Sequence, residues 1–420
     1  MNKGMPPFTK EFGYIRLARI LKPGSRKVFD ILNTFGSIER ITALTVKQWI
    51  ESTLLTPGEI AGIKRINDSE IYEIIKYCKV NGIRIITPED DEYPNNFRYI
   101  ENPPTVLYAR GERLDSTAPI IGIVGARKST EFGNKAAYSL AAKLALCGFT
   151  VVSGGAVGVD SFAHTGALNA GGKTIMVLGC GMDSDYLPVQ QPLRLMAEQN
   201  GTVITEFEPK VPASRYTFPI RNRLISALSS GVAVIEAGLN SGALITATYA
   251  MEQGKEIFAL PGRLDQVQYG GTNELLRDGA VPLLKVEDIL EVYMGRFEDK
   301  LKLCGELSAD IKQGYAREVA RLKGKSPAPA KKQVDVVKVE EKVKPADTPI
   351  QNTTFTPAEQ LPCSENAKKI YNAFTQNIEF SDTLSNISGV TGGNFIAAIT
   401  ELEIFGFIKA VPVGRYEKVK

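Results

Sequence analysis

The sequence predicts an α/β protein whose core is a parallel β-sheet covered by helices. Between Ile120 and Pro282, short apolar segments alternate with longer segments of mixed polarity. Glycine is concentrated in the same region, since residues 120–280 hold 21 of the 38 glycines. Several apolar segments run directly into a glycine-rich turn. The order strand, glycine turn, helix is how α/β proteins present backbone N–H groups to phosphates.

The order of elements within this core follows from the same alternation. We expect strands near residues 120–124, 150–153, 174–178, 202–206, 232–236 and 256–260, with helices between them, for instance over 132–147 and 161–170. Single strands that alternate with helices pair in parallel, and the helices then cover both faces of the sheet.

The chain before the core is predicted to be helical over residues 1–82. Apolar residues recur at helical spacing between Val28 and Ile38, and a further helix is expected over residues 69–80. Gly82 ends that helix, and Ile83–Ile86 has the character of a strand. We interpret residues 83–119 as a bridge into the core, so that the core domain spans residues 83–303.

Two further regions follow the core. Residues 304–363 are predicted to be a flexible linker, because residues 322–344 hold seven lysines against three acidic residues and prolines are frequent. Residues 364–420 predict three helices and two strands, the pattern of a winged helix. The third of these helices, residues 391–405, contains no Lys or Arg, which favours protein contact over DNA reading without excluding the latter.

Composition narrows the class of protein. The chain has 420 residues and a net charge of only +3, which by itself is no argument for nucleic acid. The five cysteines form no CxxC pair or Cys/His cluster, so we expect no structural zinc, no disulfide framework and no metal or other cofactor. No apolar run of about 18 residues and no secretion signal are found, so we expect a cytoplasmic protein without a membrane span.

Polar residues gather in the turns that follow the predicted strands. Arg127 comes after the first core strand, where the carboxyl edge of an α/β sheet binds ligands, and its guanidinium can contact two phosphate oxygens. The turn after the second strand supplies a hydroxyl and backbone N–H groups. Residues 209–235 contain no acidic side chain but four basic ones, which predicts a focused anion site. The candidate binding residues are Arg127, Lys128, Ser129, Ser153, Gly154, Gly155, Arg221, Asn222, Arg223 and Asn273.

Other motifs are weaker. Residues 167–174 approach a Walker A loop, but they lack its first glycine and lie between a helix and the next strand, the reverse of the required order. Asp160 and His164 share one helix, yet no nucleophile or further metal ligand pairs with them, so we expect His164 to be structural. Glu206 and Glu236 end strands and have no evident reacting partner.

Taken in order, the motifs resemble the DprA/Smf family of bacterial DNA-processing proteins. They are Gly125-Ala126-Arg127, Ser153–Asp160, Val177–Gly181, Phe218–Arg223, Ser241–Ala247 and Ala259–Gly262. The resemblance implies an extended Rossmann-like core that binds single-stranded DNA, a SAM-like N-terminal domain and a homodimer. It also implies loading of the RecA recombinase onto incoming strands during natural transformation, without enzymatic activity.

An enzyme of a different class is the alternative. Rossmann-type phosphoribohydrolases cleave nucleoside monophosphates and carry a Pro-Gly-Gly-x-Gly-Thr-x-x-Glu loop. Residues 236–242 occupy that place here, and their sequence is Glu-Ala-Gly-Leu-Asn-Ser-Gly, which does not match. We therefore expect binding rather than catalysis.

Overall fold

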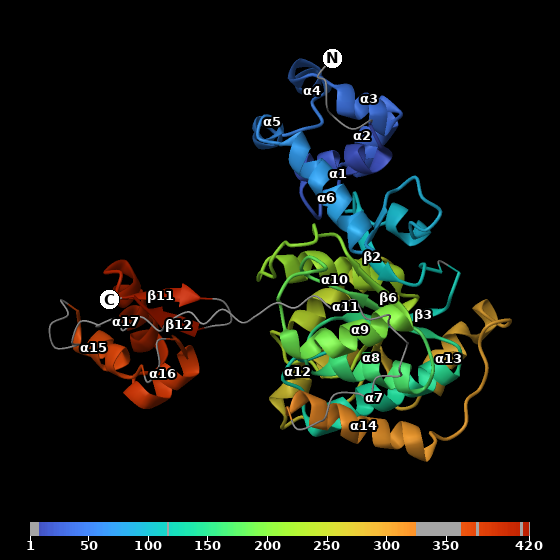
Figure 1. The fold of residues 1–420 in the computed structure, drawn as a ribbon. Helices are drawn as coiled ribbons and strands as arrows, with labels where there is room; N and C mark the ends of the chain where they lie inside the picture. The colour runs from blue at the N-terminus through green and yellow to red at the C-terminus, as the bar shows by residue number, and fades with distance from the viewer. Residues whose placement is uncertain (1–7, 116, 325–362, 375–377, 412–414, 420) are drawn as a thin grey trace, which may run out of the picture. The chain divides into compact units, whose positions relative to one another are not determined.

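The computed structural model describes residues 8–115, 117–324, 363–374, 378–411 and 415–419. The chain divides into two compact units, residues 1–330 and 331–420. Figure 1 shows the elements of both units.

A nine-stranded sheet forms the centre of the first unit. Its order is β1-β2-β6-β5-β4-β3-β7-β8-β9, and every pair from β6 to β9 is parallel. The strands are β1 (Arg84–Ile86), β2 (Leu107–Gly111), β3 (Ile120–Val124), β4 (Thr150–Gly154), β5 (Thr174–Val177), β6 (Gly201–Thr205), β7 (Gly231–Val234), β8 (Glu256–Ala259) and β9 (Val281–Pro282). The six predicted strands are confirmed as β3 to β8, each within two residues of its expected bounds.

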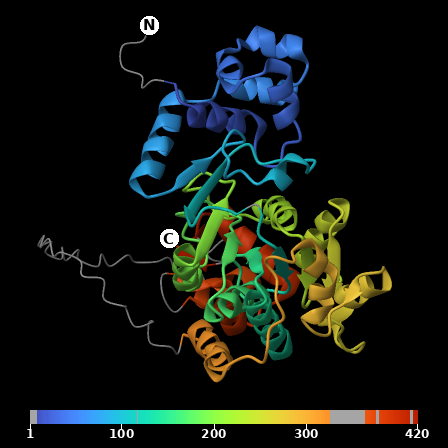
Figure 2. The same cartoon turned by 90° about the vertical axis from the view of Figure 1, so that its right-hand side faces the viewer.

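Helices cover both faces of this sheet (Figures 1 and 2). Along β3, Ile121 and Ile123 pack in the core formed with α7 (Glu131–Leu146) and α8 (Val159–Asn169). Ile120 and Val124 pack in the opposite core, formed with α10 (Thr217–Leu228), α11 (Gly242–Glu252) and α12 (Gly270–Arg277). This alternation is what a strand buried on both sides requires. The remaining helices near the sheet are α9 (Gln191–Gln199) and α13 (Glu287–Tyr293).

The strand order reverses between β3 and β7. β4, β5 and β6 extend the sheet from one side of β3, and β7, β8 and β9 extend it from the other. Such a switch point leaves a crevice at the carboxyl ends of the two central strands, where ligands of open α/β sheets bind.

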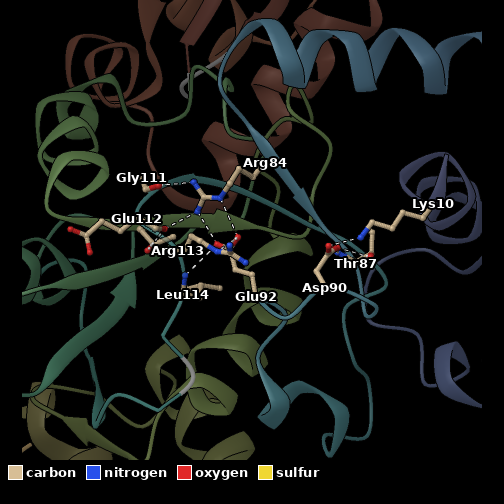
Figure 3. Close-up of polar contacts among 10 residues, drawn as sticks. Lys10, Arg84, Thr87, Asp90, Glu92, Gly111, Glu112, Arg113 and Leu114 are labelled. Atoms are coloured by element: carbon tan, nitrogen blue, oxygen red, sulfur yellow. Dashed lines mark hydrogen bonds and ion pairs between the residues drawn. The ribbon is translucent and has the colours of Figure 1, made fainter.

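The predicted bridge, residues 83–119, contributes two strands to the sheet. β1 pairs with β2 and β2 pairs with β6, both antiparallel. Figure 3 shows the polar contacts that hold this edge: Arg84 bonds Glu92 at 2.8 Å and donates to the carbonyl oxygens of Gly111 and Glu112 at 2.6 and 2.7 Å. The strand expected at Ile83–Ile86 is confirmed as β1, whereas β2 was not predicted.

Between residues 8 and 83, six helices precede the sheet, and the helical character of this region was predicted. They are α1 (Lys10–Leu21), α2 (Val28–Phe35), α3 (Ile38–Ala43), α4 (Val46–Ser52), α5 (Pro57–Ile63) and α6 (Asp68–Val80). Thr45 and Thr56 begin α4 and α5 with capping boxes, which satisfy free N–H groups at each start. The ion pair between Lys10 and Asp90, also drawn in Figure 3, ties α1 to the segment after β1.

The second unit contains α15 (Glu365–Asn372), α16 (Ser381–Ser388) and α17 (Gly392–Ile404). Its small antiparallel sheet has the order β10-β12-β11, formed by β10 (Ile378–Phe380), β11 (Ile408–Val411) and β12 (Arg415–Lys418). The three helices and the last two strands lie where the sequence predicted them, and β10 was not predicted.

The prediction of a linker from residue 304 is wrong for its first part, because residues 309–322 form helix α14. Its apolar residues Ile311, Tyr315, Val319 and Leu322 follow helical spacing and pack in the core with α7 and α8. Tyr138 of α7 also donates a hydrogen bond to the Ile311 carbonyl at 2.6 Å. The rest of the predicted linker, residues 325–362, lies outside the described residues.

This packing predicts that two truncations will differ in stability. Ending the chain after residue 305 removes α14 and exposes the apolar surface of α7 and α8, whereas ending it after residue 324 leaves that surface covered. Burying a large apolar side chain contributes about 1.5–3 kcal/mol, so we expect the shorter chain to lose at least about 2 kcal/mol of unfolding free energy. Urea denaturation of the two chains measures the difference, and equal midpoints with equal slopes would contradict it.

Candidate functional site

A pocket of about 200 Å³ lies at the carboxyl edge of the sheet, at the switch point. Four segments line it. They contribute Gly125 and Arg127 after β3, Ala156 and Asp160 after β4, Phe218, Arg221 and Asn222 from α10, and Ser241, Gly242 and Ala243 at the start of α11. The structure therefore brings three of the predicted binding residues, Arg127, Arg221 and Asn222, to one place.

Arg127 is the exposed cation of this pocket. The central carbon of its guanidinium lies 4.4 Å from the centre of the Phe218 ring, so the aromatic face orients the side chain without neutralising it. Arg127 forms no ion pair with any described residue. Lys128, the next residue, is exposed but does not line the pocket.

Arg221 is the buried cation, with 4% of its surface exposed. Its Nη1 donates to the Val177 carbonyl oxygen, and its Nε donates to Asn222 Oδ1 at 3.1 Å. A side chain at position 154 would place its Cβ 2.4 Å from Arg221 Nη1, so the predicted glycine turn makes room for this guanidinium. Burial lowers the pKa of Arg221, and the nearby Asp160 carboxylate opposes that shift.

The pocket keeps a net positive charge. Among the described residues that line it, Asp160 is the one acidic side chain, against the two arginines. Arg221 forms no ion pair with a described residue, and its largest charge partner is Asp160. A buried guanidinium without a bonded carboxylate lowers the stability of the fold, and a bound anion would offset this loss by pairing with the charge. The arrangement therefore favours an anionic ligand beside Arg127 and Arg221.

The chain's own carboxylates occupy the places where an α/β protein usually binds phosphate. Glu236, fully buried after β7, accepts hydrogen bonds from the Thr130 backbone N–H at 3.0 Å and from the Thr130 hydroxyl at 2.7 Å, at the start of α7. Asp160 accepts one from the backbone N–H of Ala156 at 3.4 Å. The N–H groups that the sequence suggested as phosphate donors are thus partly used internally, and the arginine side chains remain for a ligand.

The structure corrects the prediction for Arg223. This side chain is fully buried and forms an ion pair with the buried carboxylate of Glu206. A guanidinium without exposed surface cannot contact a phosphate in this conformation, so we leave Arg223 out of the site. Glu206, for which the sequence showed no partner, is thereby explained as its counter-ion.

Four other predicted residues do not line the pocket. The Ser153 hydroxyl is buried and donates to the Ile123 carbonyl at 2.6 Å, which corrects its interpretation as a ligand group. Ser129 bonds Asn134. Asn273 holds Gly262 through two hydrogen bonds of 3.1 Å, outside the pocket. Gly155 is half-buried next to Ala156 and does not line the pocket.

His164 is structural, as predicted. Its ring is fully buried, with Nδ1 at 2.6 Å from the Thr174 hydroxyl and Nε2 at 2.9 Å from the Gly154 carbonyl oxygen. It therefore joins the carboxyl end of β4 to the start of β5. Burial lowers the pKa of His164 to about 4.

This lowered pKa predicts a pH-dependent stability. The folded chain keeps His164 neutral down to about pH 4, whereas in the unfolded chain its pKa is about 6.5. The stabilisation is present above about pH 6.5 and is lost as the pH falls toward 4, by about 2 kcal/mol between pH 7 and pH 5. Urea denaturation of the protein and of a His164→Gln variant at several pH values tests this. The unfolding free energy of the variant should lack the fall with decreasing pH that His164 causes.

Two aromatic residues of the site were missed by sequence reasoning. Phe218 stacks with Arg127, and the Tyr186 ring lies 5.3 Å from the Phe218 ring at 52°. Phe218 stands inside the acid-free stretch of residues 209–235, so an aromatic among basic residues was the available signal. Such rings are where unpaired bases stack in proteins that bind single strands.

The described residues hold no cluster of three or more His, Cys, Asp or Glu side chains that could bind a metal ion. In the same residues, no helix is both long and apolar enough to cross a membrane.

Comparisons with known proteins indicate a single protein family. Residues 84–294 match the model of the family described as DNA recombination-mediator protein A. A putative DNA processing protein DprA of Mycobacterium tuberculosis is 33% identical over 72% of this chain and 78% of its own length. The DNA processing protein DprA of Bacillus subtilis is 37% identical over 52% of this chain and 74% of its own. The X-ray structure of DprA from Streptococcus pneumoniae superposes with a TM-score of 0.60, at 27% identity over 68% of this chain and 98% of that one.

Proposed function

The chain belongs to the DprA/Smf family, DNA recombination-mediator protein A, and on that premise we propose that it binds single-stranded DNA in the pocket formed by Arg127, Phe218 and Arg221. In this function it protects incoming DNA and loads RecA during natural transformation and recombination. It acts in the cytoplasm as a homodimer and not as an enzyme. Residues 1–82 serve as a SAM-like domain and residues 364–420 as a winged helix.

The single observation that carries the proposal is a pair of arginines, beside an aromatic ring, that form no ion pair within the described part of the chain. Arg127 and Arg221 supply charge for backbone phosphates, which carry no sequence information. Phe218 and Tyr186 supply aromatic surface for a base. A base can reach such a ring only when it is unstacked, which favours a single strand over a duplex.

The geometry does not favour the nucleoside monophosphate hydrolase. Glu236, the carboxylate that ends β7, is fully buried and bonded to Thr130 and Tyr269. Asp160 is the one acidic side chain that lines the pocket, and burial raises its pKa. Release of free base from nucleoside monophosphates by the purified protein would nevertheless revive this alternative.

Binding of fluorescent oligo-dT at a series of salt concentrations tests the proposal, with a duplex of equal length as the control. Phosphate contacts release counterions, so log K should fall linearly with log[salt], at about −0.7 per phosphate neutralised on a single strand. We expect the single strand to bind more tightly than the duplex. We also expect the slope of log K against log[salt] to correspond to at least two neutralised phosphates. Affinity that is insensitive to salt, or equal for both nucleic acids, would overturn the proposal.

A further inference from the structure

Gln190 connects the DNA site to α14, a helix that is distant in the sequence but in contact with this residue. Its side chain is 2% exposed. Its Nε2 donates to the Ala156 carbonyl oxygen at 2.7 Å and also contacts the Ser161 hydroxyl. Its Oε1 accepts a hydrogen bond from Arg321 Nη2 at 2.9 Å. The amide therefore bridges the glycine turn after β4 and helix α14.

Arg321 is held in place on α14. Glu318, one turn earlier and 4% exposed, accepts two hydrogen bonds of 2.7 Å from its guanidinium. Nη1 of Arg321 also donates to the Val189 carbonyl. Two partners on the Val189–Gln190 segment and a bidentate carboxylate leave the guanidinium little freedom.

The segment that Arg321 contacts is strained. Leu187 has φ of +50° and ψ of +69°, a left-handed conformation that branched apolar residues rarely adopt. Such a conformation persists only where surrounding contacts enforce it. The hydrogen bonds from α14 to Val189 and Gln190 are contacts of that kind.

The glycine turn at residues 154–158 packs directly against the loop that carries Arg127. Gly158 has φ of +81°, and a Cβ there would lie 2.6 Å from the Arg127 carbonyl oxygen and 2.4 Å from that of Ala126. The Val159 N–H donates to the same Ala126 carbonyl at 3.2 Å. With so little free space, a shift of the turn displaces the loop that presents the Arg127 guanidinium.

We propose that Arg321 and Gln190 are positioning residues for DNA binding, through which α14 sets the turn at residues 154–158 and with it Arg127. The inference rests on the proposed function of the same site. α14 lies beyond residues 84–294, the part that matches the family model. The bridge couples the DNA site to the helix that directly precedes residues 325–420 in the sequence.

Two variants test the contact between α14 and Gln190 separately from the contact between Gln190 and the glycine turn. Glu318→Gln/Arg321→Met removes the bridge from α14 without leaving a buried charge unpaired. Gln190→Glu keeps an acceptor for Arg321 but loses the donor to Ala156. We expect each to weaken oligo-dT binding about 5- to 10-fold and to make the salt slope shallower by about 0.7, one phosphate contact. Arg317→Met, on the exposed side of α14 and paired with Asp310, is the matched control and should do neither.

Hydrogen exchange without DNA reports on the coupling by itself. Both variants should exchange faster than the parent at residues 154–160, while Gln190→Glu keeps α14 protected. If the double variant only lowers the unfolding temperature, and leaves exchange at 154–160, affinity and salt slope unchanged, α14 is merely structural and the inference is wrong. If the parent itself does not bind oligo-dT, the proposed function fails, and exchange at 154–160 still decides whether the turn depends on α14.

Discussion

Replacing Arg223 by alanine is expected to destabilise the fold by about 3–5 kcal/mol, because it leaves the buried Glu206 carboxylate without its counter-ion. Burial already raises the pKa of Glu206, and Arg223 is the largest opposing influence. Urea denaturation at neutral pH measures the loss. At low temperature, where the variant stays folded, its affinity for oligo-dT should remain close to that of the parent.

A second variant keeps this prediction testable if the first does not fold. Arg223→Met/Glu206→Gln removes both charges, and replacing a buried ion pair by neutral groups of similar volume is often tolerated. We expect it to recover most of the lost stability. A folded Arg223→Ala protein of normal stability that had lost DNA binding would instead restore Arg223 as a phosphate ligand.

The largest effect on binding is expected from Arg127→Ala/Phe218→Ala. Arg127 is exposed, so its removal should cost a charge-assisted contact of about 1.5–3 kcal/mol without disturbing the core. Phe218 both orients Arg127 and offers a stacking surface, worth about 1–3 kcal/mol per base. Together we expect a weakening of more than about 100-fold for oligo-dT, and a similar loss for single strands of other sequences, measured by fluorescence anisotropy.

Lys135→Ala provides the control for this variant. Lys135 lies on α7, next to the Arg127 loop in sequence, and is an exposed cation paired with Glu131. Its removal should change affinity less than about twofold, because it does not line the pocket. Equal losses for the control and the double variant would mean that DNA responds to general surface charge and not to this pocket.

The sheet could be predicted because its strands are locally encoded. Each of β3 to β8 is a short apolar segment bounded by glycine or polar residues, and a strand buried on both faces needs little more. β2 and β9 were missed because neither is marked by such a local pattern. β2 owes its place to pairing with β1 and β6, and β9 is only two residues long.

The site was harder to predict, although part of the error was avoidable. Arg221 and Arg223 stand two positions apart in α10, and residues at that spacing point to different sides of a helix. Recognising the helix would have placed Arg221, which lines the pocket, and Arg223, which pairs with Glu206, on different faces. The partners Glu206 and Glu236 could not be assigned in this way, because their contacts with Arg223 and Thr130 depend on how distant segments meet.

The linker was misjudged because composition outweighed periodicity. The lysines and prolines after residue 322 made the whole region look unstructured. Yet Ile311, Tyr315, Val319 and Leu322 lie on one face of a helix, a pattern visible in the sequence alone. A boundary drawn from this pattern would have fallen after residue 322.

The carboxylate at the start of α7 bears on what else could compete for the sheet. In dinucleotide-binding proteins with this kind of sheet, the cofactor's pyrophosphate lies at the start of the helix that follows the first strand. Here Glu236 already bonds the Thr130 N–H, and Gly133 lies so close that a Cβ there would come within 2.2 Å of Glu236 Oε2. A pyrophosphate at this helix start would meet the negative charge of the Glu236 carboxylate. The chain's own carboxylate therefore takes the place of a pyrophosphate at this helix, and the neighbouring pocket with Arg127 and Arg221 is the cationic place at this edge of the sheet.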